Sequence, residues 1–151
     1  MKVTTKAYGL IDVDERQKIR IPQGLFGFEN LKDYVLLDAE QQPFYWLQSV
    51  DEQKTAFILI NPVLFRHDYE VNANNEDMAE IGLSSLDGAL VFSLVTALDD
   101  EKVTANLQGP LIINRDTREG KQIILNDLRW TTKHDIMAEL AASGTAAGGR
   151  K

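Results

Sequence analysis

Most of this chain consists of short apolar segments, rich in β-branched and aromatic residues, with turn residues between them. Such segments are typical of an all-β domain, because these side chains favour extended backbone while glycine and proline interrupt it. Residues 18–21 (KIRI) alternate polar and apolar side chains with the period of two that a half-buried strand requires, and Pro22 ends the segment. The sequence therefore predicts a mostly β fold.

Several further segments have strand character. We expect strands at residues 3–13, 34–37, 44–47, 56–60, 90–95, 111–114 and 121–125. The first of these is one long strand, weakened at Gly9. The second and third are predicted to form a hairpin, as are the last two, around a polar loop that closes at Gly120. The fourth and fifth are nearly unbroken apolar runs, which indicates central strands covered on both faces.

Helical character occurs at two places. Residues 75–81 have asparagines suited to cap a helix, carboxylates in the first turn and Gly82 as a left-handed stop. Residues 135–142 suit a terminal helix. Beyond them, alanine, glycine and polar residues cannot bury an apolar face, so we expect a disordered tail at 142–151. With no internal repeat and no earlier linker, we predict a single domain at 1–141.

Composition excludes several classes of function. The 151 residues include no cysteine, which excludes disulfides, thiolate metal sites and a cysteine nucleophile. We see no secretory signal and no apolar run long enough to cross a bilayer, so we expect a cytoplasmic protein with no membrane contact. A net charge of −7 argues against direct nucleic acid binding.

The negative charge is concentrated in one region. Residues 68–101 contain no lysine or arginine but nine carboxylates: Asp68, Glu70, Glu76, Asp77, Glu80, Asp87, Asp99, Asp100 and Glu101. Because the whole chain has a net charge of −7, the remainder carries +2. Clustered negative potential accelerates encounter with basic partners. The alternative is that these residues only keep strand edges and one helix face soluble.

The sequence offers no catalytic or metal-binding constellation. His67 and His134 each precede an aspartate, but consecutive side chains on a strand point to opposite faces. No serine lies in a Gly-x-Ser-x-Gly elbow, and no glycine-rich segment matches a phosphate loop. Two isolated histidines without cysteine are a weak ligand set. We therefore predict no enzyme, no metal and no cofactor.

Several segments together resemble a known family. In order, they are GLFGFE at 24–29, FYWLQS at 44–49, AFILINP at 56–62, TANLQGPLIIN at 104–114 and QIIL at 122–125. They resemble the bacterial flagellar assembly factor FliW family over about residues 3–137. The family more usually has Asp-Pro where this chain has Asn61-Pro62. It also usually has an aromatic residue followed by Arg-His near residues 130–134, where this chain reads WTTKH.

The resemblance implies a compact, antiparallel, β-barrel-like fold capped by short helical elements, and a non-enzymatic role. Members of the family bind the RNA-binding carbon storage regulator CsrA and lift its repression of flagellin translation. They also bind flagellin, so accumulated flagellin withdraws the factor from the regulator. The regulator is thought to be antagonised allosterically, away from its RNA-contact surface. Together these interactions form a feedback switch.

Two groups of residues are candidates for partner binding. Leu25, Phe26 and Phe28 are the apolar anchors, with a core plug as the structural alternative for each. The predicted electrostatic contacts come from the acidic region, and Asn61 is a further candidate, at the position where the family more usually has aspartate. The electrostatic set comprises Asp68, Glu70, Glu76, Asp77, Glu80, Asp99, Asp100 and Glu101. Trp46 is expected in the core, whereas the sequence favours neither position for Trp130.

Other functional classes remain open at this stage. A small β-barrel could bind flavin and act as a reductase, an inference from architecture alone. The chain could instead be a structural subunit of an oligomer. Our main prediction is a protein-binding antagonist of CsrA that flagellin sequesters, and that is monomeric when free.

Overall fold

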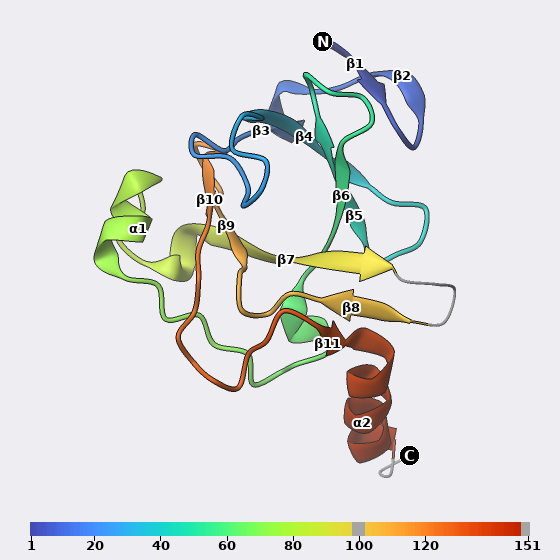
Figure 1. The fold of residues 1–151 in the computed structure, drawn as a ribbon, viewed down its shortest axis with the longest axis vertical. Helices are drawn as coiled ribbons and strands as arrows, with labels where there is room; N and C mark the ends of the chain where they lie inside the picture. The colour runs from blue at the N-terminus through green and yellow to red at the C-terminus, as the bar shows by residue number, and fades with distance from the viewer. Residues whose placement is uncertain (98–101, 149–151) are drawn as a thin grey trace.

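A computed structural model of the chain describes residues 1–97 and 102–148 (Figure 1). Its strands are β1 (Lys2–Thr5), β2 (Gly9–Asp12), β3 (Lys18–Arg20), β4 (Asp33–Asp38), β5 (Tyr45–Ser49), β6 (Ala56–Ile60), β7 (Ala89–Ala97), β8 (Val103–Ala105), β9 (Leu111–Asn114), β10 (Gly120–Gln122) and β11 (His134–Asp135). Its helices are α1 (Asn75–Glu80) and α2 (Ile136–Gly148), with 3-10 turns η1 (Glu15–Gln17), η2 (Pro62–Leu64) and η3 (Leu86–Gly88).

The strands form one large antiparallel sheet and one separate hairpin. The large sheet runs in the order β10-β9-β7-β6-β5-β4-β3, and β8 pairs with both β7 and β11. The first half of β7 pairs with β9 and its second half with β8, so the sheet divides along this strand. The predicted mostly β, antiparallel class with short helices is confirmed.

The sheet does not close into the predicted barrel. The two edge strands, β3 and β10, do not pair along their lengths, so the sheet is not closed into a barrel. Their ends meet at an isolated bridge between Arg20 and Glu119, beside a 3.0 Å hydrogen bond from Arg20 N to the Arg118 carbonyl. This contact brings the β9–β10 turn against β3.

The prediction of a single long strand at 3–13 was wrong, because these residues form the β1–β2 hairpin. Thr5 pairs with Gly9, and the Thr5 hydroxyl donates to the Gly9 carbonyl at 2.8 Å and accepts from Tyr8 N at 2.9 Å. Gly9 has φ +66°, in the left-handed region that glycine adopts readily. The glycine that weakens a strand therefore reverses the chain here.

The other predicted strands are present, although the one expected at 121–125 ends at Gln122. The hairpins β4–β5 and β9–β10 form, and β6 and β7 are internal strands of the sheet. Helix α1 begins where predicted, because the Asn74 side chain accepts from Asp77 N at 2.7 Å, and Gly82 follows it with φ +73°. Apolar side chains fill clusters on both faces of the large sheet.

Helix α2 extends through Gly148, beyond the residue at which the sequence predicts a tail to begin. In Figure 1 it extends away from the sheet, below β11. Within residues 1–97 and 102–148, no helix combines the length and apolar character needed to cross a membrane.

Candidate functional site

The loop after β3 carries the three apolar anchor candidates, and glycine shapes it. Gly24 has φ +70°, and a Cβ there would lie 2.5 Å from Glu29 Cα, so no other residue fits. Phe28 N donates to the Leu25 carbonyl at 2.8 Å. The Glu29 carboxylate accepts from Gly27 N at 2.9 Å, and this backbone hydrogen bond lowers the pKa of Glu29. The result is a compact turn with a fixed backbone.

This turn separates the three anchor candidates. Leu25 is 1% exposed and packs in the core, so its side chain takes the core-plug alternative and cannot touch a partner. Phe26 is 51% exposed. Phe28 is 41% exposed, and its ring meets Phe57 edge-to-face with 4.9 Å between centroids. Phe26 is therefore the residue of this turn most available to a partner.

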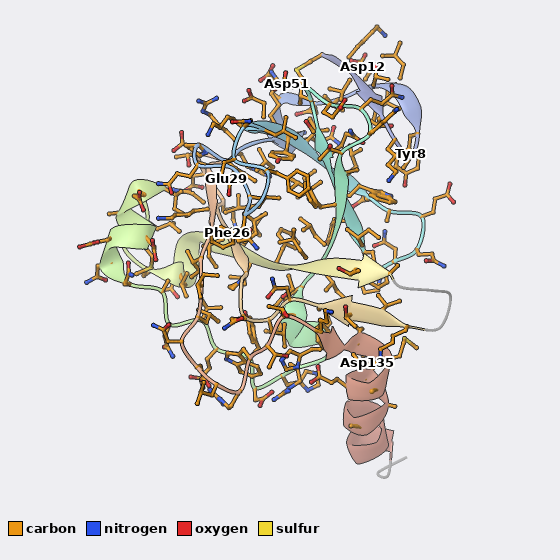
Figure 2. All side chains as sticks on the ribbon, in the orientation of Figure 1. Tyr8, Asp12, Phe26, Glu29, Asp51 and Asp135 are labelled. Carbon is orange, nitrogen blue, oxygen red and sulfur yellow. The ribbon has the colours of Figure 1, made fainter. Side chains whose placement is uncertain are left out.

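Strand β10 holds Phe26 in place from the opposite edge of the sheet. Phe26 N donates to Gln122 Oε1 at 3.0 Å, and the buried Gln122 donates through Nε2 to the Gly109 carbonyl at 2.8 Å. Ile124, just beyond β10, is 55% exposed. Phe26 and Ile124 both line a 330 Å³ depression. In Figure 2, Phe26 and Glu29 lie on the loop beside β10.

Lys121 of β10 links the acidic helix α1 to the depression that Phe26 and Ile124 line. Lys121 Nζ lies 2.6 Å from Asp77 Oδ1 and also donates to Glu80, which accepts from Gln23 Nε2 at 2.6 Å. Hydrogen bonding from Lys121 lowers the pKa of Glu80. Burial lowers the pKa of Lys121, but its bonds to both carboxylates outweigh burial and raise it. Lys121 thus offsets one of the three negative charges that α1 carries.

We call this joint feature the Phe26 surface: Phe26 and Ile124 together with Asp77, Glu80 and Lys121. Glu76 lies on the exposed side of α1, with no ion pair among the described residues. The sequence-predicted aromatic anchor and part of the predicted acidic set are therefore neighbours in space, as are a lysine and an isoleucine that the sequence did not single out.

Asp68 belongs to a different cluster, beside α2. Arg66 bonds Asp68 Oδ2 at 2.8 Å and Glu139 of α2 at 2.9 Å, and its guanidinium lies 4.8 Å from the centroid of the buried Trp130 ring. This arginine, two residues away along the chain, lowers the pKa of Asp68 through its hydrogen bond. Glu70 is exposed. In Figure 1, α1 and α2 lie on opposite sides of the molecule, so the acidic region divides between two places.

Of the four remaining candidates, three lie outside the described residues and one has a local structural role. Asp99, Asp100 and Glu101 lie outside the described residues. Asn61 is exposed and caps η2, its side-chain oxygen accepting from Val63 N at 3.2 Å. Asparagine and aspartate cap equally well, so the departure from the usual Asp-Pro preserves this turn.

Of the two histidines, His134 has a structural role beside α2. His134 accepts from Thr131 N at Nε2 (2.9 Å), so its Nδ1 carries the proton that faces Glu139 Oε1 at 2.9 Å. His67 is exposed. No group of three or more histidine, aspartate or glutamate residues suited to a metal ion occurs within 1–97 and 102–148.

Sequence reasoning missed Lys121, Gln122 and Ile124 as members of the site. Nothing local marks Lys121, because its carboxylate partners lie more than 40 residues earlier in the chain. Residues 122–125 (QIIL) show no alternation of polar and apolar side chains, so nothing in the sequence marks Ile124, which is exposed between buried neighbours.

Known proteins resemble this chain over nearly its whole length. The sequence profile of the FliW protein family matches residues 2–136. Flagellar assembly factor FliW of Treponema denticola is 48% identical over 145 residues, 95% of this chain and 99% of the relative. FliW of Treponema pallidum is 44% identical over 93% of this chain and 95% of its own length.

A solved structure has the same fold. A crystal structure of the flagellar assembly factor FliW superposes with a TM-score of 0.82, at 34% identity, covering 90% of this chain and 96% of that one. The two proteins are therefore similar in sequence as well as in fold. The chain belongs to the FliW family of flagellar assembly factors.

Proposed function

We propose that this protein acts in the cytoplasm as a non-enzymatic antagonist of the translational regulator CsrA, and that flagellin sequesters it. Family membership supports a role in flagellar assembly. The observation that carries the proposal is the Phe26 surface, where an aromatic ring 51% exposed stands beside carboxylates in a chain of net charge −7. An RNA-binding regulator is basic, and such a surface is complementary to it.

The carboxylates and the aromatic ring of the Phe26 surface contribute to binding in different ways. Exposed ion pairs contribute roughly 0–1 kcal/mol each, so the carboxylates mainly set the rate of encounter and its salt dependence. An aromatic anchor at the centre of an interface contributes about 2 kcal/mol or more. Phe26 is therefore the proposed source of affinity. Because Asp77 and Glu80 are already paired with Lys121, Glu76 is the α1 carboxylate best placed to act on a partner.

Antagonism without occupying the RNA site requires a preference between two states of the regulator. If the protein binds RNA-free CsrA about a hundredfold more tightly than the RNA-bound form, the coupling is about 2.7 kcal/mol. Equal affinity for both forms would release no RNA. If flagellin and CsrA exclude each other, flagellin weakens apparent CsrA binding by the factor 1 + [flagellin]/Kd.

A competition assay tests the whole circuit. Labelled flagellin leader RNA is bound to CsrA, this protein is added, and flagellin follows. We expect RNA release on the second addition and its reversal on the third. Failure of the protein to release RNA, with CsrA active, would refute antagonism. Release that flagellin does not reverse would refute sequestration.

Two variants with matched controls locate the surface. Phe26→Ala should weaken CsrA binding, whereas Leu10→Ala, at a 63% exposed leucine on the hairpin, should not. Glu76→Lys should flatten the salt dependence of binding, while Glu40→Lys, an exposed carboxylate elsewhere, should alter it less. Equal effects in both members of a pair would remove the Phe26 surface from the proposal.

A further inference from the structure

A basic groove lies at the end of the molecule where β3 meets the β9–β10 turn. Its volume is about 820 Å³, and η1, β3, the start of β4 and residues 115–118 line it. Its cationic side chains are Arg16, Lys18, Arg20, Arg115 and Arg118, and three carboxylates also contribute. In a chain of net charge −7, this surface has the opposite sign.

The cations of the groove are not equally available. Lys18 pairs with Glu15 at 2.8 Å and Arg20 with Asp33 at 3.2 Å. Arg115 and Arg118 make no side-chain ion pair or hydrogen bond within the described residues. Two guanidinium groups therefore face the groove side of this turn with their donors uncommitted.

The backbone of Arg118 is held in a costly conformation. Its φ is +64°, the one positive value for a residue other than glycine in the described chain. Glycine or asparagine adopts this region with less strain, so an arginine here lowers stability. Buried Asn114 fixes the turn by accepting from Asp116 N at 2.9 Å, and Arg118 N donates to the Asn114 carbonyl at 2.8 Å. Strain of this kind points to a use for the side chain.

We propose that this groove binds a short acidic peptide segment of a partner protein, with Arg115 and Arg118 as the principal carboxylate contacts. The planar guanidinium matches a carboxylate through two parallel hydrogen bonds. The inference does not rest on the proposed function, because it concerns a different surface and needs neither CsrA nor flagellin.

The groove suits a peptide better than RNA. Tyr34 is the aromatic residue of its lining and is 1% exposed, so no ring is available for bases to stack on. A polyanion that extends beyond the groove would also enter the field of the acidic region. A short acidic peptide stays within the positive surface.

Fluorescence anisotropy with a labelled hexaglutamate peptide tests the proposal on the full chain. We expect binding with a Kd of about 0.1 mM or tighter at low ionic strength, and no binding of a hexalysine peptide. Arg115→Glu combined with Arg118→Glu should weaken hexaglutamate binding about tenfold or more. Lys54→Glu combined with Lys133→Glu makes the same charge change at exposed lysines outside the groove, and should alter binding by about twofold or less.

A second variant separates binding from folding. Arg118→Gly relieves the strained backbone, so its melting temperature should equal or exceed that of the wild type while hexaglutamate binding weakens. The proposal is overturned if hexaglutamate does not bind, if both charge variants lose it equally, or if a labelled single-stranded RNA binds more tightly than the peptide. Inorganic phosphate that competes at equal concentration would likewise replace the peptide with a small anion as the ligand.

Discussion

Adjacent residues Leu25 and Phe26 should respond oppositely to truncation, because the turn buries one and exposes the other. Leu25 is 1% exposed, so Leu25→Ala removes core carbons and leaves a cavity. Transfer contributes about 0.8 kcal/mol for each carbon lost, and the cavity adds to it, giving about 3 kcal/mol of destabilisation. For a domain of this size, that lowers the melting temperature by about 6–12 °C.

Phe26→Ala loses much less. The ring is 51% exposed, so about half of its burial energy is at stake, roughly 1 kcal/mol and about 2–4 °C. The hydrogen bond from Phe26 N to Gln122 remains, because it uses the backbone. Binding to CsrA should nevertheless fall by about 2 kcal/mol if the ring is a central anchor.

Thermal unfolding by circular dichroism and calorimetric titration with CsrA measure the two quantities separately. We expect Leu25→Ala to melt early yet bind normally below its transition, and Phe26→Ala to melt near the wild type yet bind weakly. An equal loss of stability in both variants would refute the separation of roles within the turn. Unchanged CsrA binding by a folded Phe26→Ala variant would refute the anchor.

Three further predictions concern how the Phe26 surface is built. Gly24→Ala should destabilise the fold by about 2 kcal/mol or more in urea titrations, because its Cβ would lie 2.5 Å from Glu29 Cα at positive φ. Lys121→Met should lower the melting temperature at pH 7, and by progressively less as the pH falls below 4.5. Lys121 holds the pKa of Glu80 below its ordinary 4.5. A carboxyl whose pKa is lower in the folded state stabilises the fold above its ordinary pKa, and this stabilisation is lost as the pH falls through the folded-state pKa. Gln122→Leu should cost about 2 kcal/mol in the same urea assay, because it leaves a buried carbonyl without its donor.

The strands were predictable because their signals are local. Alternation in 18–21 and the apolar runs that became β6 and β7 report burial of each segment, and glycine or proline bounds them. Gly9 shows the limit, since whether a glycine weakens a strand or reverses it depends on its neighbours. Here the two hydrogen bonds of the Thr5 hydroxyl stabilise a turn.

The site was less predictable because it depends on contacts between distant segments. A turn has no period, so nothing in the sequence separates buried Leu25 from exposed Phe26. The tryptophans show the same limit: Trp130 is 1% exposed, whereas Trp46, expected in the core, is half-buried beneath the β1–β2 hairpin. Only the fold reveals that Lys121 neutralises part of the acidic helix.

The Phe26 surface is pre-formed, and this bears on how a partner binds it. The loop is held by Gln122 from one edge strand and, through Gln23, by Glu80 of α1, while Lys121 holds α1 to that same strand. Moving the ring would break hydrogen bonds to elements far apart in the sequence. A partner therefore loses little affinity to ordering this surface. Under the proposed antagonism, the shift in the regulator's equilibrium is set by the difference between this protein's affinities for the two forms, and a pre-formed surface lowers neither affinity by an ordering cost.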